Sequence, residues 1–284
     1  MKKTLLIILG IFIFLLVSLL ALPFVFKGKI LERIDKEIAS SVNAQVYYDF
    51  DNVSLSVFKR FPHISATVEQ FGIVGNEPFQ GDTLVHMDKL QVDFNLKSVL
   101  FGDIPTLTGI HLDGGSLFVK VLEDGTANYD ITYPSEEDTV TESNFEIAVD
   151  LIRVNNFNLI YDDRSLQYFM ALGNINMEGS GDFTADVYDL PVKMDALIGD
   201  IAYEEIHYLT NKQFKGETTM NIDMANMKFA FGEGEYALND FLFDMKGFIA
   251  MPAEDIEIDL SFGGKNNTFK SILSLVHGIY TESF

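Results

Sequence analysis

The chain has 284 residues, of which 42 are acidic and 20 are basic, and its formal net charge is −22. A surface this acidic repels a phosphate backbone, so nucleic-acid binding is not expected. The absence of cysteine excludes disulfides, thiolate catalysis and cysteine-ligated metals. The 25 phenylalanines and only seven prolines favour a β-sheet with a large apolar face.

The N-terminal segment is long and apolar. Residues 4–26 carry no charge, and as a helix they are long enough to cross the ~30 Å hydrocarbon core of a bilayer. A cleaved signal peptide is the alternative, but its apolar region is shorter, at ~7–15 residues, and Leu22 to Phe26 offer no small-x-small cleavage site. We therefore predict an uncleaved transmembrane helix at 4–26 and a cytoplasmic tail at 1–3. The rest of the chain lies on the other side of the membrane.

A short amphipathic helix is predicted at 29–43, because Ile30, Leu31, Ile34 and Ile38 recur at helical spacing opposite charged residues. We expect this helix to cover the end of the sheet that follows. A helix lying on the membrane surface is the alternative.

From residue 44 onward the apolar period changes to two, which predicts about a dozen short strands. An acidic loop or linker at 134–146 divides them into a first β segment, 44–133, and a second, 147–284. No long helical pattern separates the strands, so the sheet is expected to be antiparallel. Asp113-Gly114-Gly115 is predicted to be a hairpin turn.

Each predicted strand has one apolar and one polar face, so the sheet is covered on one side only. Two mainly β architectures remain open. One is a curved antiparallel sheet that forms an apolar groove, and the other is a closed β-sandwich. In the groove architecture, the side chains predicted to line the groove are Leu90, Val92, Phe94, Leu96, Phe229, Phe231, Phe241, Phe243, Ile256, Ile258, Leu260 and Phe262.

The last part of the chain returns to helical spacing at 268–276, which predicts a C-terminal helix. The final residues carry no turn or cap signal. We therefore expect a truncated chain or the N-terminal portion of a longer one.

The sequence contains no recognisable catalytic constellation. None of the five histidines stands three or four residues from another, and neither a P-loop nor a G-x-S-x-G elbow is present. We predict no catalytic residues, no metal site and no cofactor. The protein is therefore not expected to be an enzyme.

The order of these features resembles the N-terminal region of the AsmA family. The resemblance is carried by Phe61-Pro62-x-Ile64, by the strand 90–96 that enters Leu100-Phe101-Gly102, and by the hairpin that ends at 124–129. It implies a single-pass inner-membrane protein of a diderm bacterium with its bulk in the periplasm. Such proteins resemble bridge-like lipid-transfer proteins and are implicated in phospholipid transport to the outer membrane and in outer-membrane biogenesis. Family members are usually much longer, so we expect a fragment or a reduced member.

The first functional hypothesis is therefore a membrane-anchored protein that binds the acyl chains of phospholipids or other lipids in an apolar β-groove. The alternative is a membrane-tethered β-sandwich, a structural or protein-interaction module that docks partners of the cell envelope.

Overall fold

The computed structural model describes residues 28, 32, 36, 42–48, 53–57, 60–102, 104–131, 146–182, 185–251 and 257–275. The predicted tail and anchor lie outside these residues, as do most of the predicted amphipathic helix and most of the acidic linker. Among the described residues, no helix is long and apolar enough to cross a membrane.

The described part of the chain is mainly β. Its strands are β1 (Gln45–Tyr47), β2 (Ser54–Ser56), β3 (His63–Val74), β4 (Thr83–Asn95), β5 (Thr106–Val121), β6 (Glu146–Asp163), β7 (Tyr168–Ser180), β8 (Val187–Tyr203), β9 (Ile206–Asp223), β10 (Lys228–Leu238), β11 (Phe241–Ala250) and β12 (Glu257–Gly264). Its two helices are α2 (Leu96–Phe101) and α3 (Phe269–Leu273).

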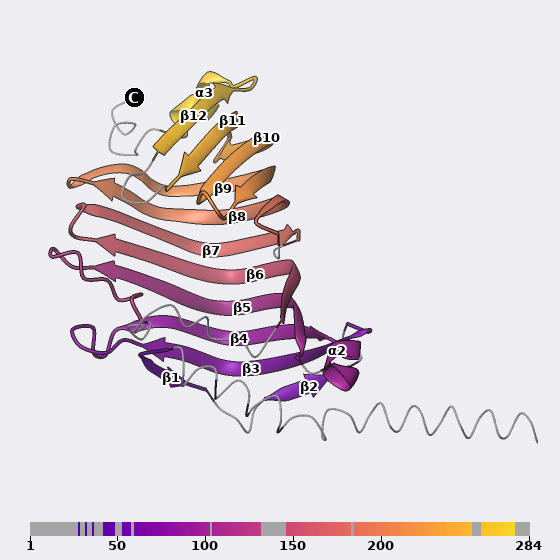
Figure 1. The fold of residues 1–284 in the computed structure, drawn as a ribbon. Coiled ribbons are helices and arrows are strands. Elements are labelled where there is room, and N and C mark those ends of the chain that lie inside the picture. The colour runs from indigo at the N-terminus through magenta and orange to yellow at the C-terminus, as the bar shows by residue number, and fades with distance from the viewer. Residues whose placement is uncertain are drawn as a thin grey trace, which may run out of the picture.

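All of these strands belong to one open, curled sheet (Figure 1). The strand order is β1-β3-β4-β5-β6-β7-β8-β9-β10-β11-β12, and β2 pairs with the half of β3 that β1 leaves free. A closed β-sandwich needs two sheets packed face to face. The described strands do not form that arrangement.

One pair of neighbouring strands departs from the predicted antiparallel sheet. β5 and β6 run parallel, from Thr106↔Glu146 to Val121↔Asp163, while the other strand pairs in the described part of the chain are antiparallel. Parallel neighbours need a connection that crosses back along the sheet, and residues 122–145 supply it. The predicted linker belongs to this crossover, and the strands on either side of it share one sheet.

Several strands bend where a residue has a positive φ. Gln70 (φ 55°), Gly114 (φ 74°), Asn156 (φ 50°) and Asn174 (φ 50°) follow one another across β3, β5, β6 and β7. Glycine and asparagine tolerate this conformation, which interrupts the regular geometry of a strand. These residues therefore form a line along which the sheet bends, and on β6 and β7 the pairing register also shifts there.

Asparagine side chains replace the backbone hydrogen bonds that the bulges interrupt. The Asn156 backbone N–H donates to Asn176 Oδ1 at 3.0 Å, and the Asn174 backbone N–H donates to Asn158 Oδ1 at 3.2 Å. Backbone N–H groups within a sheet are rarely left unpaired. The asparagines thus stabilise the bend on one face of β6 and β7.

The Asp113-Gly114-Gly115 segment lies on this line inside β5, so its prediction as a hairpin turn was wrong. β5 continues through it without reversing. A Cβ atom at Gly115 would lie 2.3 Å from the His86 carbonyl oxygen, so only glycine fits this close approach between β5 and β4.

The apolar side of the bend contains a cluster of buried residues. Val154, Phe157, Ile175 and Ala196, from β6, β7 and β8, are all below 10 % exposed and pack with Leu112, Leu117, Leu172 and Met177. Leu112 and Leu117 lie on opposite sides of Gly114 in β5. Because side chains from both sides of the bend meet in this cluster, the sheet bends toward its apolar face, which is concave.

Two short helices lie at the ends of the sheet. α2 begins where Asn95 Oδ1 accepts hydrogen bonds from the backbone N–H groups of Lys97 and Ser98, at 3.0 and 3.1 Å. The predicted strand residue Leu96 is therefore the first residue of α2. The predicted C-terminal helix is represented by α3, which Thr268 caps by accepting from the Ser271 backbone N–H at 3.2 Å.

Candidate functional site: the concave apolar face

The register of the sheet aligns apolar side chains from β3 to β12 on one face. Residues directly opposite each other on paired strands point to the same side of a sheet. One such row passes through Val68, Leu90, Leu112, Val154, Met177, Met194, Gly216, Tyr236, Phe243 and Gly264. We call this side the apolar face and the opposite side the polar face.

Ten of the twelve predicted groove residues lie on the apolar face. They are Leu90, Val92 and Phe94 of β4, Phe229 and Phe231 of β10, Phe241 and Phe243 of β11, and Ile258, Leu260 and Phe262 of β12. Leu96 differs because it begins α2, from which it packs against the buried cluster of Val57, Ile64, Ala66 and Phe94. Ile256 lies outside the described residues.

The apolar face is covered at one end of the sheet and exposed at the other. Phe94 is 4 % exposed, because Leu55 and Val57 near β2 and Val99 of α2 pack in the same cluster. Ile258 and Phe262 on β12 are each 65 % exposed. The accessible part of the face therefore lies toward β12.

Aromatic rings line the apolar face from β9 to β12. Phe214 and Phe243 flank Tyr236, with ring centroids 6.5 and 5.5 Å from the tyrosine ring. Phe241 and Phe262 continue the row, with centroids 6.2 and 6.3 Å from Phe243. Stacked and tilted pairs at these separations are favourable.

One buried cluster of the apolar face is absent from the predicted groove residues. Val154, Phe157, Ile175 and Ala196 line the bend, but the bulge residues between and beside them interrupt the apolar–polar alternation. The prediction selected the strands with the cleanest alternation. The repeated asparagines of β6 and β7 could have indicated the bend, because asparagine tolerates a positive φ better than most residues.

Lys212 is the basic residue on an otherwise apolar row. It is opposite Ile198 of β8 and 7 % exposed, and its Nζ donates to the Ser274 carbonyl oxygen at 2.7 Å. Asn239 donates to the same oxygen at 3.1 Å. These contacts hold the chain just after α3 against β9 and the end of β10.

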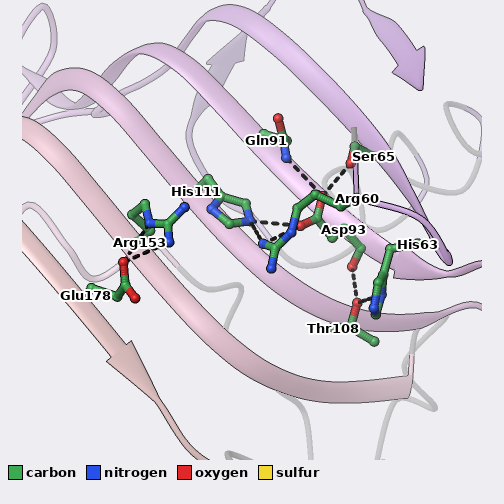
Figure 2. Close-up of polar contacts among 9 residues, drawn as sticks. All are labelled: Arg60, His63, Ser65, Gln91, Asp93, Thr108, His111, Arg153 and Glu178. Atoms are coloured by element: carbon green, nitrogen blue, oxygen red, sulfur yellow. Dashed lines mark hydrogen bonds and ion pairs between the residues drawn. The ribbon is translucent and has the colours of Figure 1, made fainter. Parts of the chain in front are cut away.

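The polar face carries a buried network around Asp93 (Figure 2). Its carboxylate accepts hydrogen bonds from Arg60 Nη1 at 2.9 Å, Ser65 Oγ at 2.6 Å and His111 Nε2 at 2.8 Å. Burial raises the pKa of Asp93, but the hydrogen bonds from His111, Ser65 and Gln91 outweigh it and lower the pKa to about 2. The carboxylate is therefore ionised at neutral pH.

This network joins neighbouring elements of the fold. Asp93 itself is 2 % exposed. Its partners come from the segment before β3 and from β3, β4 and β5, and they join these elements. Figure 2 also shows Arg153 of β6 bonded to Glu178 of β7, at 2.8 Å. Among the described residues, no group of three or more His, Cys, Asp or Glu could hold a metal ion.

A surface depression of about 650 Å³ lies over β7 to β10, but its charged lining belongs to the polar face. Glu178, Lys193, Glu217 and Glu235 are neighbours in the register and project into it. Its carboxylates suit neither an acyl chain nor an anion. We regard the depression as the space between rows of long side chains and place the candidate site on the apolar face.

Comparison with known proteins adds no family to this geometry. No family model, no curated protein and no solved structure matches the chain. The resemblance to the AsmA family therefore stays a prediction from sequence motifs.

Proposed function

We propose that the concave apolar face is a groove that binds the acyl chains of membrane lipids. The protein would be held at the inner membrane by the predicted anchor, with its sheet in the periplasm. As in the AsmA family that its motifs resemble, it would take part in phospholipid transport toward the outer membrane. No covalent step is needed.

The observation that carries this proposal is the largely apolar face on a sheet that no second sheet covers in the described residues. Soluble proteins rarely expose a large contiguous apolar surface without a function. Ile258 and Phe262 are each 65 % exposed, so part of this surface is open to a ligand.

The dimensions of the face suit an acyl chain. Beyond the covered end, from β6 to β12, the sheet makes six inter-strand steps, which at ~4.8 Å each amount to about 29 Å. This length is close to the ~30 Å hydrocarbon thickness of a bilayer. A chain lying across the strands keeps its methylene groups out of water, and each exposed group would cost about 0.8 kcal/mol.

A module that binds envelope proteins is the second candidate, because an exposed apolar surface also suits a protein partner. The sandwich form of that hypothesis does not agree with the single open sheet. A partner protein would have to supply the missing cover.

Photo-crosslinking in membranes tests the proposal. A photoreactive phenylalanine analogue replaces Phe262 or Ile258 on the apolar face, and Glu257 or Asp259 on the polar face of the same strand. We expect lipid adducts, identified by mass spectrometry, at the first pair and none at the second. Phe94 is a further control, because β2 and α2 cover it.

Protein adducts alone at Phe262 and Ile258 would favour the interaction module. Equal lipid labelling on both faces of β12 would mean non-specific contact with the bilayer and would contradict the groove.

A further inference from the structure

Tyr236 lies on the apolar face, and its surroundings do not explain why it carries a hydroxyl group. It lies on β10, opposite Gly216 of β9 and Phe243 of β11. A Cβ atom at Gly216 would lie 3.0 Å from Tyr236 Cδ1, so the tyrosine ring occupies the space that the glycine leaves. The ring stacks on Phe243 with an interplanar angle of 21°.

The hydroxyl group of Tyr236 is buried without a hydrogen-bond partner. The residue is 5 % exposed. Among the buried side-chain oxygen and nitrogen atoms of the described residues, Tyr236 Oη is the one without a hydrogen-bond partner. An unpaired buried hydroxyl costs about 1–3 kcal/mol. Phenylalanine would pack in the same way without this cost, and the neighbouring positions Phe214, Phe241 and Phe243 are phenylalanine.

An acyl lipid would supply the missing partner. Its hydrocarbon chain suits the aromatic row, and the carbonyl oxygen at the head of that chain is an acceptor that needs a donor in an apolar site. A tyrosine hydroxyl is such a donor. Lys212 is another hydrogen-bond donor on this face, but its Nζ already donates to the Ser274 carbonyl oxygen.

We propose that Tyr236 Oη donates a hydrogen bond to the carbonyl oxygen of an acyl ester or fatty acid bound on the apolar face. This inference rests on the proposed function. It adds the ligand class, which is an acyl carbonyl compound rather than a plain hydrocarbon. It also places the polar end of the bound ligand over β10. Binding includes displacement of the side chains that shield Oη.

The test compares Tyr236→Phe with the wild-type chain, purified at full length in detergent. Both are mixed with equal amounts of dioleoyl phosphatidylglycerol and its di-O-oleyl ether analogue, which lacks the carbonyl groups. Native mass spectrometry reads the two bound lipids in one spectrum. We expect the wild type to prefer the ester lipid about 5- to 10-fold, as for one hydrogen bond, and Tyr236→Phe to bind both equally.

Thermal unfolding without lipid gives the second readout. Tyr236→Phe should melt at the same or a higher temperature than the wild type, because it removes an unpaired hydroxyl. Tyr203→Phe is the matched control: Tyr203 is on the apolar face of β8 but is 44 % exposed, so its hydroxyl is hydrated and the substitution should change neither readout.

The outcomes separate this inference from the proposed function. If neither lipid binds to the wild type, the proposed function fails. If both lipids bind to the wild type without preference, the apolar face binds chains but the role of Tyr236 is wrong. A lower melting temperature for Tyr236→Phe would show that the hydroxyl already has a stabilising partner, which also overturns the inference.

Discussion

Replacing Phe94 by alanine should destabilise the protein strongly, whereas the same change at Phe262 should not. Both side chains lie on the apolar face, but Phe94 is 4 % exposed and Phe262 is 65 % exposed. Removing a buried phenylalanine costs about 3–5 kcal/mol, from lost burial and the cavity that remains. Phe262 buries about a third of its surface, so we expect its removal to cost about 1 kcal/mol.

Urea unfolding followed by far-ultraviolet circular dichroism measures both variants, since the chain has no tryptophan for fluorescence. In thermal unfolding, Phe94→Ala should melt about 10 °C lower than the wild type, since 1 kcal/mol shifts a domain of this size by about 2–4 °C. If Phe262→Ala is as destabilising as Phe94→Ala, then β12 is covered and the accessible apolar surface does not exist. If Phe94→Ala costs less than about 1 kcal/mol, then β2 and α2 do not cover that end of the sheet.

Three further predictions test other parts of the fold. The pKa of Asp93 falls from 3.8 to about 2 on folding, so its contribution of about 2 kcal/mol is complete above about pH 5 and is lost as the pH falls toward 2. The difference in unfolding free energy between wild type and Asp93→Asn should shrink over that interval in urea titrations, and a constant difference would contradict this assignment. Asn176→Ala removes the acceptor of the Asn156 backbone N–H and should cost about 1 kcal/mol, with faster hydrogen exchange at that amide. Gly247→Ala would place a Cβ atom 1.8 Å from a β12 carbonyl oxygen and should open the β11–β12 pair to hydrogen exchange. Gly125→Ala, which also has a positive φ but no atom within 4 Å, should cost only about 1 kcal/mol, and equal effects would refute the steric argument.

The strands and their faces could be predicted from the sequence because alternation is a local property. Leu90, Val92 and Phe94 point the same way in any strand, whatever the rest of the chain does. The apolar residues of β10, β11 and β12 could be assigned to one face for the same reason. The pattern predicts strands well where no bulge interrupts it.

Strand direction and sheet curvature could not be predicted, because alternation contains no information on either. The parallel pairing of β5 and β6 depends on the path of the crossover. The bend depends on positive-φ residues such as Gly114, whose Asp-Gly-Gly sequence is equally typical of a hairpin turn.

The Asp93 network was missed for a different reason. Its members Arg60, Ser65 and His111 are distant in sequence and meet only after β3, β4 and β5 have paired. Each residue alone looks like an ordinary polar residue on a solvated strand face. The unpaired hydroxyl of Tyr236 is likewise a property of packing, which the sequence does not reveal.

The parallel contact between β5 and β6 has a consequence for how the chain folds. β3 to β5 and β6 to β12 are runs of antiparallel neighbours whose pairings are local in sequence and close rapidly. The β5–β6 pairing requires the ends of the long crossover to meet, which carries a larger loop-closure entropy. We therefore expect each run to form its own meander early, and the two meanders to join along β5 and β6 in the slowest folding step.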